Sequence, residues 1–299
     1  MALLIITTIL WAFSFSLIGE YLAGQVDSTF SVLMRVGLAA LVFLPFLRTR
    51  GQSIKTLSLY MLVGALQLGV MYLFSFRAYL YLTVSEFLLF TVFTPLYITL
   101  IYDVLSKRPL RWGYALSAGL AVAGAAIIRY DKVSDHFWTG LLLVQLANIS
   151  FAIGMVGYKR LMETRPMPQH SAFSWFYLGA FLVAVVAWFT LGNPQKLPTT
   201  DLQWGILVWL GVAASGLGYF MWNYGATQVD AGTLGIMNNV HVPAGLLVNL
   251  AIWQEQPHWP SFIIGGAVIM ASLWVHRRWV APRSSQTADD RRRAGAPSE

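Results

Sequence analysis

The sequence predicts an all-α membrane protein in which ten transmembrane helices form two inverted five-helix repeats around a central cavity. Composition is the first observation: 57% of the 299 residues are hydrophobic and only 11% are charged, against about 45–50% and about 25% in globular chains. The second is that apolar stretches of about 20 residues, the length a helix needs to cross a bilayer, recur along almost the whole chain. The third is that prolines and aromatic residues recur 148 positions apart.

Ten apolar stretches can be counted along the chain. Most of the connections between them are short, so successive helices should pack as antiparallel neighbours. The first stretch lacks the basic leader of a cleaved signal peptide and is too long for one, so it is predicted to be a membrane helix. The tail 282–299 is polar and is expected to be disordered. The predicted spans are 2–23, 29–47, 57–76, 84–105, 112–129, 137–158, 171–191, 203–225, 232–253 and 260–280.

Basic residues predict the orientation of the spans. With the N-terminus in the cytoplasm, 15 of the 20 Lys and Arg side chains fall in cytoplasmic segments and four fall in outer loops, while Arg35 lies within a span. Because cytoplasmic loops carry the excess of Lys and Arg, both termini are expected to be cytoplasmic. The four outer positions are Arg77, Arg129, Lys132 and Lys196.

An internal repeat divides the ten spans five and five. A second offset of 138 residues aligns positions near the start of each half. The predicted repeats are 1–132 and 133–281, and because five is odd the second must cross the membrane with opposite polarity. Inverted repeats of this kind are typical of secondary transporters, whose solute site lies near the midplane between the repeats. The matches at 148 are Ala78 with Ala226, Pro95 with Pro243, Pro109 with Pro257, Phe74 with Trp222 and Phe76 with Tyr224; those at 138 are Phe13 with Phe151 and Gly19 with Gly157.

The ninth span carries an unusual polar stretch, GIMNNVHVPAG (235–245). Asn238 and His241 fall on one helical face together with Gly245 and Asn249, and Pro243 can kink the helix there. This pattern predicts a cavity wall with Pro95 and Pro243 as possible hinges. The alternative is that the polar groups hydrogen-bond between helices. His241 could bind a coupled proton or stay neutral.

Other candidates for the cavity lining are aromatic and small polar residues placed deep within spans. Aromatic side chains offer large contact areas with a polar tip, and would suit apolar or aromatic solutes. The alternatives are interfacial belts for the aromatic residues and helix packing for the serine. These candidates are Trp11, Ser14, Tyr79, Tyr97, Trp175, Trp222 and Asn223.

Two ionisable residues have a possible charge role. Arg35 lies about six residues into the second span, and an arginine within the membrane is a functional candidate because burying its charge is costly. It could attract a solute carboxylate, pair with Glu20, or extend to the outer interface. Glu20 lies near the outer end of the first span.

Several classes of function are excluded by the sequence. The chain has no cysteine, no metal-ligand spacing and none of the motifs HExxH, DDxxD, GxSxG or Walker A, so an enzyme, a metal site and a cofactor are not expected. A nucleic-acid partner is rejected because the basic residues behind the net charge of +7 sit in short loops and the tail. An inverted repeat within one chain argues for alternating access rather than a channel. Nucleotide-sugar transport would need more basic residues in the cavity.

The pattern resembles the drug/metabolite transporter superfamily, EamA type. This resemblance rests on the ten spans, the two cytoplasmic termini and the proline in the fourth helix of each half. The closest resemblance is to the YddG-type aromatic amino-acid exporters, through LWAFSFSLIGEYL (10–22) and NNVHVPAG (238–245). The resemblance implies export of aromatic and other neutral amino acids, or of related metabolites, across the bacterial inner membrane by alternating access. The alternative within the superfamily is a proton-coupled multidrug exporter. A monomer is expected, or a homodimer through the small apolar spans five and ten.

Overall fold

The computed structural model describes residues 2–49, 51–105, 112–128, 135–228, 231–254 and 258–279. Within these ranges all regular structure is helical and falls into ten runs, which confirms the predicted all-α class and the ten spans. Seven runs are long and apolar enough to cross a membrane, and shorter apolar helices follow toward the C-terminus. The tail 282–299 and the predicted repeat boundary at 132–133 lie outside the described residues.

Some of the runs are continuous α-helix and others contain a different helical turn. The segment η2 is a 3₁₀ turn, whereas η1, η3, η5 and η6 are π-helical. In chain order the segments are α1 Ala2–Leu17, η1 Ile18–Leu22, α2 Ser28–Phe43, η2 Leu44–Phe46, α3 Ile54–Gly64, η3 Ala65–Val70, α4 Met71–Ala78, α5 Val84–Thr91, α6 Thr94–Leu105, α7 Trp112–Ile128, α8 Asp135–Thr164, α9 Gln169–Leu191, α10 Asp201–Trp209, η5 Leu210–Leu217, α11 Gly218–Thr227, α12 Ala231–Val248, η6 Asn249–Trp253 and α13 Trp259–Trp279.

Short polar side chains set where several helices begin. The carboxylate of Asp27 accepts from the backbone N–H of Phe30 at 2.8 Å, just before α2. Thr83 and Glu86 form a reciprocal capping box at the start of α5. Each cap satisfies an N–H that the first helical turn cannot. These polar residues therefore mark where the loops end and the spans start.

The fourth span breaks between α5 and α6, immediately before Pro95. Proline has no N–H to offer the carbonyl four residues earlier, which here belongs to Thr91. The Thr94 hydroxyl donates to that carbonyl at 2.7 Å. The neighbouring carbonyl of Phe90 accepts from Asn148 Nδ2 on α8 at 2.9 Å. The break is thus stabilised by side chains and holds Thr91, Thr94 and Asn148 close together.

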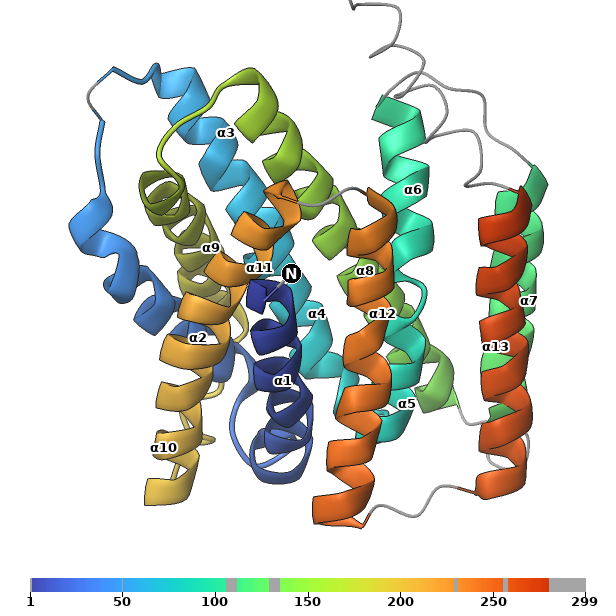
Figure 1. Cartoon of the computed structure of the whole chain (residues 1–299). Coiled ribbons are helices and arrows are strands. Elements are labelled where there is room, and N and C mark those ends of the chain that lie inside the picture. The colour runs from blue at the N-terminus through green and yellow to red at the C-terminus, as the bar shows by residue number, and fades with distance from the viewer. Residues whose placement is uncertain are drawn as a thin grey trace, which may run out of the picture. The chain divides into compact units, whose positions relative to one another are not determined.

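The chain divides into two compact units, and the larger contains Met1–Ile98 and Ser134–Gln256. Within it α1 packs against α12, α2 and α3 pack against α9, and α4 packs against α8 (Figure 1). The crossing of α3 with α9 depends on glycine: a Cβ at Gly64 would lie 1.9 Å from the Phe176 carbonyl oxygen, and one at Gly179 would lie 1.9 Å from that of Met61. The two backbones therefore touch, as in many membrane-helix pairs.

The second unit contains Thr99–Val133 and Pro257–Glu299. In it α7 and α13 lie side by side (Figure 1). A Cβ at Gly124 would lie 2.7 Å from the Gly265 carbonyl oxygen, so small residues again permit close backbone contact. The small apolar fifth and tenth spans thus pair with each other. A homodimer through them stays a prediction.

Candidate functional site

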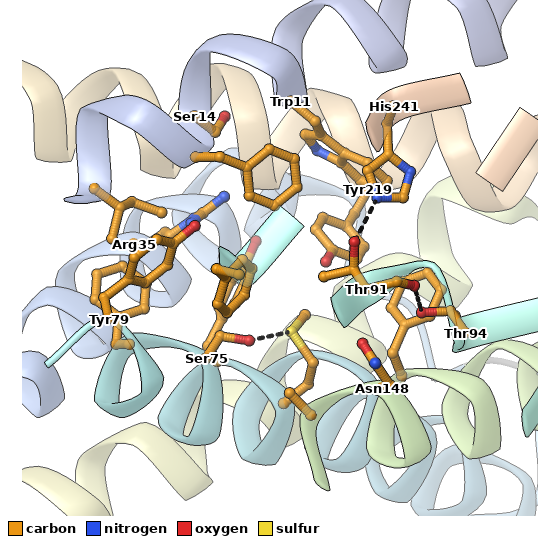
Figure 2. A pocket seen from close by; sticks show the side chains of 18 residues that line it. Trp11, Ser14, Arg35, Ser75, Tyr79, Thr91, Thr94, Asn148, Tyr219 and His241 are labelled. Carbon is orange, nitrogen blue, oxygen red and sulfur yellow. Dashed lines mark hydrogen bonds between the residues drawn. The ribbon is translucent and has the colours of Figure 1, made fainter. Parts of the chain in front are cut away.

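A cavity lies within the larger unit, among α1, α2, α4, α5, α6, α8, α11 and α12. The cavity volume open to the centres of water molecules is about 90 Å³. This is several times the roughly 10–15 Å³ that one water needs. Its lining is mainly aromatic and apolar, with a few polar groups (Figure 2). The lining residues are Trp11, Ser14, Phe15, Ile18, Arg35, Met71, Tyr72, Ser75, Phe76, Tyr79, Phe87, Thr91, Thr94, Ala147, Asn148, Phe151, Tyr219 and His241.

Aromatic rings from both halves of the chain form one wall. The Trp11 ring lies 4.7 Å from that of Tyr219 and 5.0 Å from that of Trp222. Its indole N–H donates to the Ala214 carbonyl at 3.0 Å, which fixes the orientation of the ring. A Cβ at Gly218 would lie 3.2 Å from this indole nitrogen. The wall is an aromatic surface, suited to a flat or apolar solute.

A second side of the cavity is built around Arg35 on α2. Its side chain is only 3% exposed. Its Nε donates to Ser215 Oγ at 2.5 Å, and its Cζ lies 4.1 Å from the centre of the Tyr72 ring. Tyr72 and Ser215 also share a hydrogen bond of 2.8 Å between their hydroxyls. Tyr177 donates to the backbone carbonyl of Ser215 at 2.6 Å.

Arg35 is the only charged side chain among the described residues that line the cavity. No Asp or Glu belongs to that lining. Buried arginine in a membrane protein is normally paired, because the isolated charge is expensive. Among the described lining residues, the charge of Arg35 therefore has no acidic partner.

Neutral polar groups lie on the other side of the cavity from Arg35 (Figure 2). His241 stacks on Phe15 with ring centres 5.7 Å apart, and its Nε2 lies 3.5 Å from the Thr91 hydroxyl oxygen. Asn148, near Thr91 and Thr94, uses its amide NH₂ for the Phe90 carbonyl. This side can offer hydrogen bonds to a neutral polar group but has no fixed charge.

Five of the residues singled out from the sequence come together in the lining: Trp11, Ser14, Arg35, Tyr79 and His241. Tyr79 stacks on Phe87 with ring centres 4.3 Å apart. Ser14 donates to the Leu10 carbonyl of its own helix at 3.0 Å.

The other singled-out residues lie elsewhere. Trp222 and Asn223 are buried behind the lining, where Asn223 accepts from Gln67 Nε2 at 3.1 Å. Tyr97 donates to Gln145 at 3.1 Å, and the indole of Trp175 donates to the Arg48 carbonyl at 3.0 Å.

The structure gives positions for the residues predicted to have a charge or hinge role. Glu20 is exposed, unlike the buried Arg35. Pro95 lies at the start of α6, and Pro243 lies inside α12. The side chain of Asn238 falls outside the described part of the structure. Asn249 bonds between helices, accepting from Ser16 at 3.1 Å.

Spans three, six and eight also carry Tyr72, Asn148 and Tyr219, which the sequence places within the membrane and the structure places in the lining. Thr91 also lines the cavity but was not singled out from the sequence. A helical signal was present, because Tyr72, Ser75 and Tyr79 share one face and Thr91 and Thr94 are three residues apart. Phe15 and Phe87 carried no such signal, since an apolar side chain in an apolar span looks the same whether it faces lipid or a cavity. Within the described ranges no group of three or more His, Asp or Glu residues could hold a metal ion.

Comparison with known proteins gives consistent results. The profile of the EamA-like transporter family matches residues 1–130 and again residues 138–277. The chain is 84% identical over 299 residues to a protein of Escherichia coli K12 named "Biotin transporter", with all of both chains covered. It is 83% identical over the same length to one of that name from Salmonella typhimurium. A "Probable biotin transporter" of Pseudomonas aeruginosa is 55% identical over 279 residues, covering 93% of this chain and 97% of its own.

A crystal structure matches with a TM-score of 0.64 and 18% identity, covering 94% of this chain and 98% of its own. At that identity the likeness concerns the fold alone.

Proposed function

We propose that this chain, which belongs to the EamA-like transporter family, carries biotin across the membrane. The observation that carries the proposal is its identity of 84% and 83%, over its whole length, to proteins named biotin transporter. The family is one of transporters, so the chain is a membrane transporter of a small molecule and not an enzyme.

These relatives correct the substrate expected from the sequence. Export of aromatic or other neutral amino acids is wrong, and so is the alternative of multidrug export, because the relatives are named for biotin. The superfamily is confirmed, but these relatives do not support the closer resemblance to aromatic amino-acid exporters. Deep aromatic residues suit the ring of phenylalanine and the fused ring of biotin equally well, so such residues could not separate the two solutes.

The cavity chemistry supports biotin as the solute. Biotin has an apolar fused ring with a polar ureido group at one end and an aliphatic chain ending in a carboxylate at the other. The aromatic wall at Trp11 and Tyr219 can cover the ring. Asn148 and Thr91 can bond the ureido group, while Arg35 supplies a positive charge. An amino acid would bring an ammonium group, and the described residues of the lining include no carboxylate to pair with it.

The proposal includes a location and a transport cycle. We place the chain in the bacterial inner membrane with both termini in the cytoplasm, an arrangement supported by the distribution of Lys and Arg. Two matches of one family profile support two related halves. With opposite polarity, as the odd number of spans per half requires, the halves would alternate access around the cavity.

Transport of labelled biotin into proteoliposomes tests the proposal. Saturable biotin transport is expected, with no transport of labelled phenylalanine or of a cationic dye. Trp11→Phe, which shortens the cavity wall and removes the bond to Ala214, should raise KM several-fold. Trp188→Phe is the matched control, because Trp188 packs on Phe30 outside the lining. Biotin flux no greater than in protein-free liposomes would reject the function.

A further inference from the structure

We infer that Arg35 binds the carboxylate of the transported solute, so that the protein selects free acids over their esters and amides. This inference rests on the proposed function and assigns it a specificity-determining residue. It also gives the solute an orientation, with its carboxylate toward α2 and its ring toward α5 and α8.

The burial of Arg35 is the first argument. A guanidinium that is 3% exposed within a span has lost most of its hydration, and that loss needs compensation. Ser215 and the Tyr72 ring are neutral partners; they orient the group but leave its charge unpaired. With no acidic side chain among the described lining residues, a solute anion can complete the pair.

The geometry of the guanidinium is the second argument. Its single hydrogen bond to a described residue runs from Nε to Ser215. The two terminal nitrogens, Nη1 and Nη2, therefore keep their four N–H donors for the cavity that Arg35 lines. These donors form a planar fork that matches the two oxygens of a carboxylate.

The bracing of the guanidinium is the third argument. The Tyr72 ring lies beneath it at 4.1 Å, a distance suited to cation–π attraction. The Tyr72 hydroxyl bonds Ser215, and Tyr177 bonds the backbone carbonyls of Ser215 and Gly216 at 2.6 and 2.8 Å. Arg35 is thus held by elements of both halves, and its fork is oriented before a solute arrives.

Complementary groups lie across the cavity (Figure 2). Asn148 uses its NH₂ group within the protein, but its amide oxygen makes no hydrogen bond with a described residue. That oxygen is a suitable acceptor for the N–H groups of a cyclic urea. An elongated solute with an anionic end and a urea end would therefore satisfy both sides at once.

Competition with neutral derivatives tests the inference. Biotin methyl ester and biotinamide keep the ring and lose the charge. Each should inhibit uptake of labelled biotin with a constant about 10–100-fold higher than that of unlabelled biotin, the factor expected for one charge-assisted hydrogen-bonded pair. Equal inhibition by biotin and its ester would overturn the inference and leave biotin transport intact.

Variants assign the effect to Arg35. Arg35→Gln should weaken biotin binding by that same factor and leave ester binding unchanged, which removes the discrimination. Arg35→Lys, which keeps the positive charge but loses the planar pair of guanidinium donors, should retain part of the discrimination between biotin and its ester. Ser215→Ala should raise KM for biotin without lowering the maximal rate, as expected of a positioning residue. Arg77→Gln is the control, because Arg77 is exposed at the end of α4.

Thermal stabilisation of the purified protein by biotin and by its ester gives a readout independent of transport. Stabilisation by biotin alone, lost in a folded Arg35→Gln protein, supports the inference. Stabilisation by both ligands to the same extent rejects it, whether or not the liposomes transport. If Arg35→Gln does not fold, Ser215→Ala must still reduce the difference between the thermal stabilisation by biotin and that by its ester. An unchanged difference rejects the inference.

Discussion

The third and eighth spans share a backbone irregularity but use it differently. Each contains a π-helical segment, η3 and η5, at positions related by the 148-residue repeat. Gln67 in η3 and Ser215 in η5 are equivalent, and both are fully buried. Gln67 donates to Asn223 behind the lining, whereas Ser215 holds Arg35 at the cavity. π-helical turns often occur at functional sites, yet here only the second one contacts the candidate site.

This difference indicates how two related halves make one asymmetric site. The repeat sets the backbone twice, while single side chains decide which half binds and which half packs. Tyr72 and its equivalent Phe220 show the same division. Tyr72 lies under Arg35, and Phe220 packs among Phe43 and Phe173.

The largest expected effect concerns folding. In the first half Gly64→Val should leave little folded protein, because even a Cβ there would overlap the Phe176 carbonyl. The equivalent position in the second half already holds a valine, Val212, which is half-buried. Val212→Ala should therefore give a monodisperse protein with nearly the wild-type Tm. Size-exclusion chromatography and thermal unfolding in detergent measure the folded fraction and the Tm of both variants. A Gly64→Val protein with wild-type Tm would show that the α3–α9 crossing is not close.

The second prediction compares two equivalent residues, one expected to affect solute affinity and the other expected to affect only stability. Ser215→Ala should raise KM for biotin about tenfold, since the bond to a charged group is worth about 1.5–3 kcal/mol. Gln67→Leu should leave KM within twofold and lower stability by only about 0.6 kcal/mol, a typical interhelical bond. The loss of stability in Gln67→Leu is small because Gln67 Oε1 has no partner among the described residues. Equal changes of KM in the two variants would contradict the asymmetry of the halves.

The third prediction compares two equivalent aromatic residues. Tyr72→Phe keeps the ring beneath Arg35 but removes the bond to Ser215, so KM for biotin should rise about threefold, or about 0.6 kcal/mol. Phe220→Leu should lower Tm and leave KM unchanged, because Phe220 is not part of the lining. Uptake kinetics and thermal unfolding on the same preparations separate the two outcomes. A larger KM change in Phe220→Leu would place the site nearer α9.

The smallest expected change in transport is that of Tyr177→Phe. Two carbonyls of η5 would lose their donor, which costs about 1–3 kcal/mol of stability, and KM should rise about twofold as η5 loosens beneath Arg35. Tyr60→Phe is the control: its hydroxyl donates to the Arg165 carbonyl away from the lining. It should lower Tm without changing KM. If both variants change KM alike, the effect of Tyr177 is not local to η5.

The sequence by itself determined the class of protein and the number of spans. Ten apolar runs were readable because lipid requires about 20 apolar residues per helix and forces each span to satisfy its own backbone. Pro95 and Pro243 stood out as possible hinges because proline removes a backbone donor, and a hinge role for either stays a prediction. Pro95 lies just after the break between α5 and α6, whereas Pro243 lies inside α12. Charge at Arg35 and polarity at His241 stood out because both are costly in lipid.

Only the tertiary structure decided which side chains meet. Arg35 and Ser215 are 180 positions apart, and nothing local to either distinguishes a bond between them from a pair with Glu20. Trp11 and Trp222 had the same signal, yet Trp11 faces the cavity and Trp222 lies behind it. The physical reason is that hydropathy records how deeply a residue lies in the membrane, whereas its direction around the helix axis depends on the neighbouring helices. A cavity forms where those directions converge, and that convergence is a property of packing between distant segments.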